Sequence, residues 1–309
     1  MSEKKLGFEF DISRHKKELE DAFDSLREPY SKGVREKNEK LLSSLGGEFN
    51  VCWDAWKEAG QGNLDQLPPT FLKEDKTFNE GAFFAAAEKL DSTYREYLKR
   101  VIAEKMSGIA SAESSKQLTT EDRSEAMPGF AIDFIKKLEF FSRLEFPLVQ
   151  IEAGGRTAQE LENEIEKNEM TIDFFARPML RSDRFPTSKE SEQVYLTRLE
   201  VRDLGFPDDQ SQNPSLEEVY EKAKEFGLEL CRAEVGPAYR IAYKDQPKGE
   251  SFFIAMEPLF YSGNIARVFV VSHWGQIELD AAAAGIPDTH YGPKARFIFR
   301  LPSEKNQGK

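Results

Sequence analysis

The sequence predicts an α+β protein, in which a helical N-terminal region precedes a C-terminal, mostly antiparallel sheet with one packed helix. Three observations support this class. Apolar residues recur every three to four positions through the first third of the chain, and this period changes to two near residue 194. Beyond residue 226, short runs rich in Phe, Val and Ile alternate with Gly- and Pro-containing segments, a pattern typical of strands joined by turns.

The first third is predicted to be a helical domain over 1–106, and its clearest amphipathic stretch is a helix over 80–106. The apolar face of that helix comprises Phe83, Phe84, Ala87, Leu90, Tyr94, Tyr97, Val101 and Ile102. The residues of 107–127 are mostly small and polar, so this segment is interpreted as a linker.

A helical connecting region is predicted over 128–195. Thr157 precedes Glu160 by three residues, which is the pattern of a capping box at the start of a helix. The acidic residues that follow are interpreted as a solvated helix face rather than a cation site.

The remaining residues are predicted to form a C-terminal α+β domain over 196–303, with a polar tail over 304–309. Pro214 and Ser215 begin its helix, and Gly227 ends it. The expected strands after this helix are the apolar runs 228–232, 238–243, 251–257, 267–274, 276–281 and 295–301.

The charge of the chain disfavours several classes of partner. Lys and Arg number 43 against 55 Asp and Glu, for a net charge of -12, and the acidic excess lies mainly within 107–225. Such a field repels nucleic acid and anionic lipid, so nucleic acid is not expected to bind the whole chain. Cys52 and Cys231 have no metal-binding spacing, and no apolar leader or membrane-spanning run is present. A cytoplasmic protein with free thiols and no membrane contact is therefore expected.

The segment around Cys231 contains the first candidate site residues. Cys231 ends a short apolar run beside Arg232, and a buried thiol is favoured over a nucleophile because free Cys is among the most buried residue types. Gly236 and Pro237 are interpreted as a rigid turn. Glu234 precedes this turn, either as a site acid or as an acceptor that stabilises the turn.

A possible ligand surface comes from alternation along the expected strands. The candidate ligand-binding residues are Arg240, Arg267, Arg296, Arg300 and Tyr243. If their strands are neighbours, the four arginines gather on one surface near His273, and Arg with Tyr suits the recognition of phosphate or a base. The alternative is the solvent face of a half-exposed sheet, with each arginine lying over its neighbours.

Motifs for metals and cofactors are not found in the sequence. His273, Asp280, Asp288 and His290 are suitable ligand types, but they lack the spacing of known metal motifs, so no metal is predicted. No phosphate-binding loop, dinucleotide fingerprint or serine-hydrolase elbow is present, and no cofactor is expected.

Several blocks near the C-terminus resemble a group of uncharacterised bacterial proteins that carry similar blocks in the same order. The blocks are LGF at 204–206, GLELC at 227–231, AEVGP at 233–237, DQPKGE at 245–250, AMEPL at 255–259, RVF at 267–269 and RFIFR at 296–300. Those proteins usually have Cys-Pro before the AEVGP block, where this chain has Cys231-Arg232. The resemblance implies a shared domain over 196–301 and carries no known activity.

Three functional hypotheses follow. The first is a binding or regulatory protein that recognises a protein or small ligand, with partner contacts or self-association through the N-terminal helices. The second is a small, metal-independent, RNase-like or phosphodiester-acting enzyme in the C-terminal domain, with His273 as general acid or base and Glu234 as its partner. The third is a structural component of a larger assembly.

Overall fold

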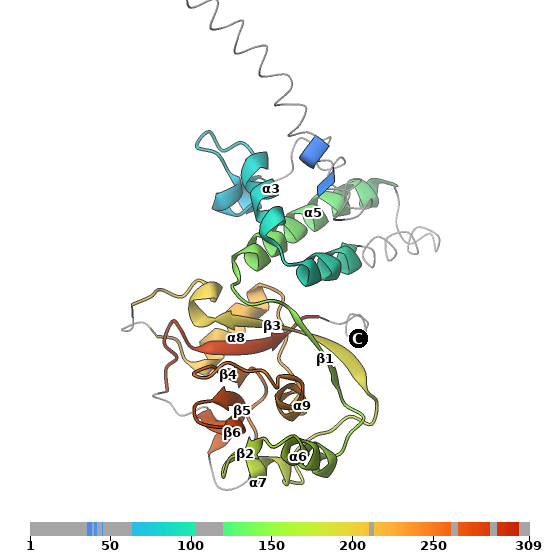
Figure 1. Cartoon of the computed structure of the whole chain (residues 1–309). Helices are drawn as coiled ribbons and strands as arrows, with labels where there is room; N and C mark the ends of the chain where they lie inside the picture. The colour runs from blue at the N-terminus through green and yellow to red at the C-terminus, as the bar shows by residue number, and fades with distance from the viewer. Residues whose placement is uncertain are drawn as a thin grey trace, which may run out of the picture. The chain divides into compact units, whose positions relative to one another are not determined.

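The computed structural model describes residues 36–38, 40–41, 45, 64–102, 120–209, 213–260, 265–284 and 289–302. Cys52, Asp288 and the tail 304–309 lie outside these ranges. The chain divides into two compact units, one comprising 1–88 and 98–135 and the other 89–97 and 136–309 (Figure 1).

An aromatic cluster forms a core in the first unit. The short helices η1 (Leu64–Gln66) and η2 (Pro69–Phe71) precede α3 (Glu80–Lys89). Phe71, Phe78 and Phe83 meet edge-on or tilted, with ring centroids 5.9–6.5 Å apart. All three side chains are buried, so this cluster holds α3 against the turn before it.

The helix expected over 80–106 is two helices. After α3, Leu90 and Asp91 interrupt the helical backbone, and 92–102 are helical again. Asp91 Oδ1 accepts a hydrogen bond from the Thr93 N–H at 2.8 Å, so Asp91 caps the second helix. The apolar period continues across the break, which is why the sequence pattern does not reveal it.

The expected linker over 107–127 needs a correction at its end. Residues 120–127 begin α5 (Thr120–Arg143), whereas 103–119 lie outside the described residues. Glu, Arg, Ala and Met have high helix propensity, so a polar composition is compatible with a helix at this position.

The second unit is built on a seven-stranded mixed sheet with the order β1-β3-β7-β4-β5-β6-β2. Its strands are β1 (Val149–Ala153), β2 (Thr171–Ile172), β3 (Glu192–Glu200), β4 (Ser251–Ile254), β5 (Ala266–His273), β6 (Ile277–Ala284) and β7 (Arg296–Arg300). The β2–β6 and β4–β7 pairs are parallel and the other four pairs are antiparallel. The predicted α+β class is confirmed, and the sheet is mixed.

Between 154 and 242, the described residues form four helices and one short turn of helix beside the sheet, rather than the single helix expected. They are α6 (Ala158–Lys167), α7 (Ala176–Leu180), η3 (Val201–Leu204), α8 (Leu216–Glu225) and α9 (Val235–Ala242). The sheet curls around α9, which contacts β1 on one side and β5 and β6 on the other (Figure 1). Thr157 and Ser215 each form a complete capping box at the start of α6 and α8, as the sequence predicts for Thr157.

Aromatic side chains fill the core between the sheet and its helices. Tyr220 of α8 meets Phe297 and Phe299 of β7 edge-on at 6.5 and 6.1 Å.

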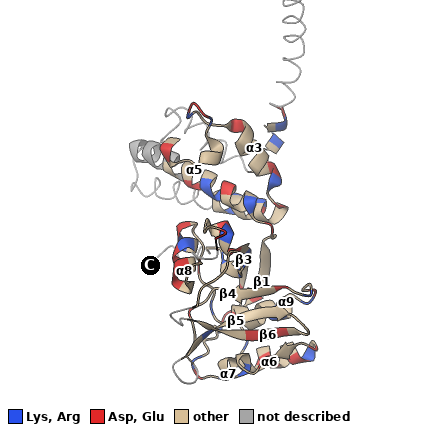
Figure 2. Ribbon diagram, turned by 90° about the vertical axis from the view of Figure 1, so that its left-hand side faces the viewer, with Lys and Arg blue, Asp and Glu red and all other residues tan. Residues whose placement is uncertain are grey.

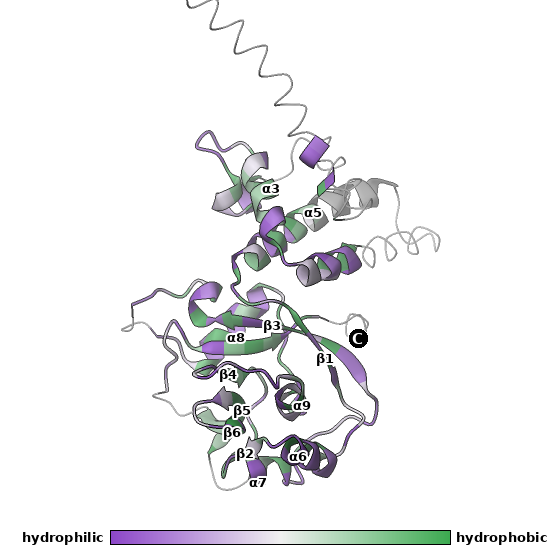
Figure 3. Ribbon diagram, viewed as in Figure 1, coloured by the Kyte–Doolittle hydropathy of each residue, from purple (hydrophilic) through white to green (hydrophobic). Residues whose placement is uncertain are grey.

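The central strands are largely hydrophobic, whereas α6 exposes a hydrophilic side (Figure 3). Acidic and basic residues follow one another along α8 (Figure 2). None of the helices in the described ranges is long and apolar enough to cross a membrane.

The expected domain boundaries around the sheet also need correction. The region 128–195, expected to be helical and connecting, contains β1, β2 and the start of β3, which belong to the same sheet as the later strands. A boundary at 196 would cut β3 in two. β1 has five residues and β2 only two, so each strand is too short for its alternation of apolar and polar residues to be recognised beside the acidic helix α6.

The segment 238–243, expected to be a strand, lies largely in α9. Pro237 occupies the first turn of this helix, where a missing N–H costs nothing. Every residue from Val235 to Ile241 is buried, because the helix lies inside the curl of the sheet. A helix that is buried on all sides has no polar face, so its sequence resembles that of a buried strand.

Candidate functional site

The four arginines expected to form one surface are brought to one side of the sheet but not to one site. The strand register places Arg267, Arg296 and Arg300 on the sheet face that α9 covers. β4 separates the strand of Arg267 from that of Arg296 and Arg300. Arg240 projects from α9 itself, and each of the four arginines has its own set of contacts.

Arg240 is fully buried at the end of α9. Its guanidinium donates to the side-chain oxygen of Gln246 and to the carbonyl of Tyr243, with the carbonyl of Ser272 at 3.5 Å. No carboxylate pairs with it in the part of the chain that the structure describes. Burial therefore lowers the pKa of Arg240 to about 10. These contacts join α9 to the following turn and to β5, so Arg240 has a structural role.

Glu234 lies at the start of α9 within a network of ion pairs. It accepts a hydrogen bond from the Ser188 N–H at 2.8 Å and pairs with Arg232 at 2.7 Å. Arg232 also pairs with Glu192 at 2.8 Å, and Glu192 pairs with Arg300 at 3.2 Å. Glu234 and Arg300 thus belong to a chain of ion pairs that links the start of α9 to β3 and β7.

Arg296 and Arg198 stack on aromatic rings beside this network. Arg296 pairs with Glu200 at 3.1 Å and lies 5.2 Å from the ring centre of Phe146. Arg198 lies 5.2–5.5 Å from the ring centres of Phe146, Tyr243 and Phe252. Cation–π contacts of this kind stabilise a buried guanidinium in place of a counter-ion. Arg198 was not among the predicted residues, although it shares the alternation of Glu200 on β3.

His273 is the last residue of β5, and its ring contacts the turn that follows α9. Its Nδ1 lies 2.6 Å from the carbonyl oxygen of Gln246, which can only accept, so Nδ1 carries the proton. Tyr243 donates its hydroxyl to Glu250 at 2.8 Å in the same turn. His273 therefore joins this turn to β5, and Tyr243 holds the turn itself.

The expected acid–base pair is separated by the length of α9. Glu234 lies at the first end of this eight-residue helix, and the Gln246 partner of His273 lies beyond its last residue. At 1.5 Å per residue, the helix separates the two ends by about 12 Å. A direct hydrogen bond between Glu234 and His273 is incompatible with this placement.

The thiol of Cys231 is buried and protonated near neutral pH. Burial raises its pKa to about 12, and the thiol faces the carbonyl of Ile298 at 3.6 Å. This geometry agrees with a packed residue rather than a nucleophile. Within the described ranges, no group of three or more His, Cys, Asp or Glu side chains is arranged to hold a metal ion.

A pocket on the second unit contains residues that the sequence pattern did not single out. It lies between α7 and the first residues of β5 and has a volume of about 850 Å³. Its lining comprises Phe174, Phe175, Arg177, Pro178, Arg181, Ser182, Ile265 and Arg267. We call it the α7–β5 pocket. Arg267 is the one predicted ligand-binding residue that the structure places in it.

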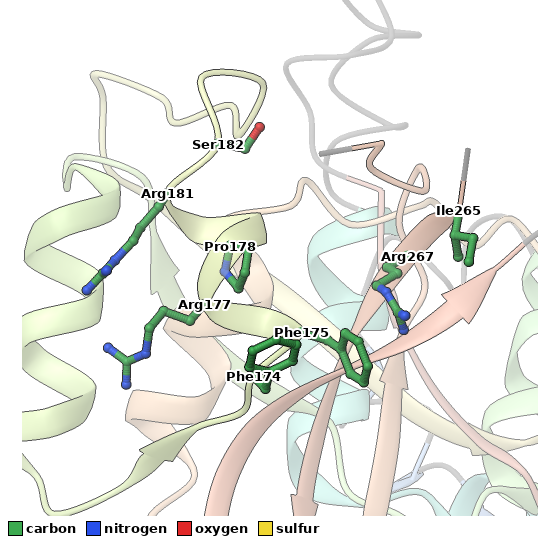
Figure 4. A pocket seen from close by; sticks show the side chains of 8 residues that line it. All are labelled: Phe174, Phe175, Arg177, Pro178, Arg181, Ser182, Ile265 and Arg267. Atoms are coloured by element: carbon green, nitrogen blue, oxygen red, sulfur yellow. The ribbon is translucent and has the colours of Figure 1, made fainter. Parts of the chain in front are cut away.

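Exposed aromatic rings form the mouth of the α7–β5 pocket. Phe174 is 79% exposed and Phe175 is 41% exposed, and their rings meet edge-on at 5.3 Å. The guanidinium of Arg267 lies 3.9 Å from the ring centre of Phe175. In Figure 4 the two Phe rings lie between Arg267 on one side and Arg177 and Arg181 on the other. Contiguous exposed apolar side chains of this kind are more common at interaction sites than on the rest of a folded surface.

A buried carboxylate fixes the α7 side of the pocket. Glu162 of α6 is 1% exposed and accepts hydrogen bonds from Arg177 and, at 2.7 and 3.0 Å, from Arg181. Arg177 also pairs with Glu166 at 2.6 Å. The acidic helix is thus more than a solvated face, because one of its carboxylates positions α7. The hydrogen bonds from Arg181 hold the pKa of Glu162 below its ordinary value of 4.5.

We expect Glu162→Gln to lower the free energy of unfolding by about 2 kcal/mol at pH 7, because charged hydrogen bonds are lost. A carboxyl whose pKa is depressed in the folded state stabilises the protein above its unfolded pKa, near 4.5, and this contribution is lost as the pH falls through the folded value. Denaturant unfolding between pH 7 and pH 3 should therefore show the two proteins converging in acid. Glu164→Gln, which removes a more exposed pair with Arg156, is the control and should cost less. Equal losses in both variants would contradict this assignment.

No family model, curated protein or solved structure matches the chain.

Proposed function

We propose that the protein is a binding or regulatory protein that recognises a partner protein through the α7–β5 pocket. The observation that supports this most strongly is the exposure of Phe174, 79%, beside Phe175 and Ile265, which are 41% and 48% exposed. Aromatic residues and Arg are the types enriched at the energetic centres of protein interfaces. The pocket combines both types on one surface.

Burial of these side chains in a complex would supply the favourable free energy. A Phe side chain moved from water into an apolar contact contributes about 1.5–3 kcal/mol. Phe174 makes its ring contact with Phe175, which is itself exposed, so a partner can cover both rings at once. The stacked guanidinium of Arg267 adds a polar group at the edge of the same contact.

The positions of His273 and Glu234 favour this proposal over a phosphodiester-acting enzyme. Each side chain is held by hydrogen bonds or ion pairs that join structural elements, and α9 separates them. Arg240, proposed to bind phosphate, is fully buried. No observation on the described residues supports a second function.

We expect Phe174→Ser to weaken the binding of a partner at least tenfold, the scale of an interface residue of high energy. The full chain would be used as bait in quantitative affinity capture from host lysate, followed by titration of the retained protein. Thermal unfolding should change little, because the Phe174 side chain is exposed.

Trp274→Ser is the matched control, since Trp274 is 64% exposed at the opposite end of β5 from Arg267. At about 3.3 Å per residue, the seven residues from Arg267 to Trp274 span roughly 23 Å, so this change leaves the pocket intact. If the wild-type protein and Phe174→Ser retain the same proteins with equal affinity, the proposed function is wrong.

A further inference from the structure

Arg267 brings a positive charge to the α7–β5 pocket that no acidic side chain of the described chain neutralises. The lining includes three arginines and no Asp or Glu. Arg177 and Arg181 turn away from the pocket toward Glu162 and Glu166 of α6 (Figure 4). The contacts of Arg267 are the ring of Phe175 at 3.9 Å and the carbonyl of Ala281 at 3.4 Å. In the part of the chain that the structure describes, no carboxylate pairs with Arg267.

We propose that the partner segment bound by the α7–β5 pocket is an acidic peptide, in which an apolar side chain enters the pocket and an adjacent Asp or Glu pairs with Arg267. This inference rests on the proposed function and adds the chemistry of the partner. An arginine that is already stacked on Phe175 is held in place, so it loses little conformational freedom when it pairs with a carboxylate.

The shape of the pocket favours a peptide over a small molecule. Small ligands have 70–90% or more of their surface buried in a typical site. Phe174, at 79% exposure, projects from the surface instead of enclosing a cavity. A peptide can insert one side chain between Phe175 and Pro178 and cover the outer face of Phe174 with its neighbours. The volume of about 850 Å³ leaves room for an apolar side chain together with the adjacent carboxylate.

Charge favours a peptide over a membrane surface. The net charge of the chain is -12, so an extended anionic bilayer would meet the acidic surfaces of the protein as well as Arg267. The Debye length at physiological salt is about 8 Å. A short segment seated in the pocket therefore responds mainly to the local cation, and the distant acidic residues are screened.

The test is selection from a random-peptide display library with the full chain as the target. We expect enrichment of peptides that place Asp or Glu next to an aromatic or aliphatic residue, and loss of this enrichment with Phe174→Ser. The affinity of a selected peptide should fall about fivefold with Arg267→Gln, the scale of one exposed ion pair. Its dependence on salt should weaken as well.

Lys248→Gln is the matched control, because Lys248 is an exposed cation in the turn after α9, and it should leave the affinity unchanged. Arg267→Lys keeps the charge but loses the stacking on Phe175, so the affinity should fall less than with Arg267→Gln; the difference between the two variants separates loss of charge from loss of packing.

Each alternative result contradicts a distinct statement. Enrichment of apolar peptides without acidic residues, dependent on Phe174, would overturn the acidic chemistry and leave the proposed function intact. If the protein sediments with phosphatidylserine vesicles and this depends on Phe174, the occupant of the pocket is a membrane surface and not a peptide. If the protein forms a dimer that depends on Phe174, the occupant is a second copy of the chain. Absence of any Phe174-dependent enrichment would overturn both the inference and the proposed function.

Discussion

Arg240→Ala should lower the free energy of unfolding by about 4 kcal/mol, the sum of a large cavity and several unsatisfied acceptors. Arg240 is fully buried, so its removal leaves a void that water cannot readily fill. Gln246, Tyr243 and Ser272 each lose a donor from the same guanidinium. Gln246 also donates to the carbonyl of Val271 at 3.2 Å, so its displacement would disturb β5.

The charge of Arg240 does not itself stabilise the fold. Burial lowers its pKa to about 10, which means that the charged form is less favourable in the folded protein than in water. We therefore expect Arg240→Met to be less harmful than Arg240→Ala, since Met fills most of the volume and introduces no charge. The difference between the two variants measures the cavity, and the remaining loss measures the unpaired acceptors.

Urea unfolding of the full chain, followed by circular dichroism, gives the free energies. Lys248→Ala, at an exposed position in the neighbouring turn, should change them by less than about 0.5 kcal/mol. A wild-type stability for Arg240→Ala would show that the guanidinium is not buried, and Arg240 would again be a candidate for ligand binding.

Arg240 also illustrates how far the sequence predicts this fold. The alternation of residues along β5 correctly predicts the sheet face on which Arg267 lies. Successive side chains of a strand point to opposite faces, and this holds even where both faces are covered by other residues. The same reasoning fails for Arg240, since Ala-Tyr-Arg-Ile-Ala-Tyr fits a strand and a buried helix equally well. Tertiary burial inside the curled sheet decides between them, and no local pattern encodes that burial.

The α7–β5 pocket was harder to predict. Phe174 and Phe175 lie between a two-residue strand and a five-residue helix, which are both too short for a periodic signal. Ile265 and Arg267 join them from nearly a hundred residues later in the chain. The signal that the sequence does offer is the spacing of Arg177 and Arg181. These two residues are four apart and therefore lie on one side of a helix, where they can pair with the acidic residues around Glu162.

The close packing of α9 on the sheet leads to the second large prediction, that Gly236→Ala should lower the free energy of unfolding by about 3 kcal/mol. A Cβ atom at Gly236 would lie 2.8–2.9 Å from the ring and Cβ of Phe269 on β5. Phe269 is fully buried and meets Phe185 edge-on at 6.0 Å, so it has little room to move. The clash outweighs the gain in helix propensity of about 1 kcal/mol that Gly→Ala provides in a helix.

The double variant Gly236→Ala/Phe269→Leu tests this cause directly. Leu is smaller than Phe and provides space for the new methyl group, so the double variant should be less destabilised than the sum of the two single changes. Gly275→Ala is the control, because no atom lies within 4 Å of a Cβ at Gly275, and its effect should stay within about 0.5 kcal/mol. Strict additivity in the double variant would contradict the clash. Coupling between the two positions would instead identify the contact of α9 with β5 as the reason why Gly is required at position 236, where the sequence alone suggested a turn.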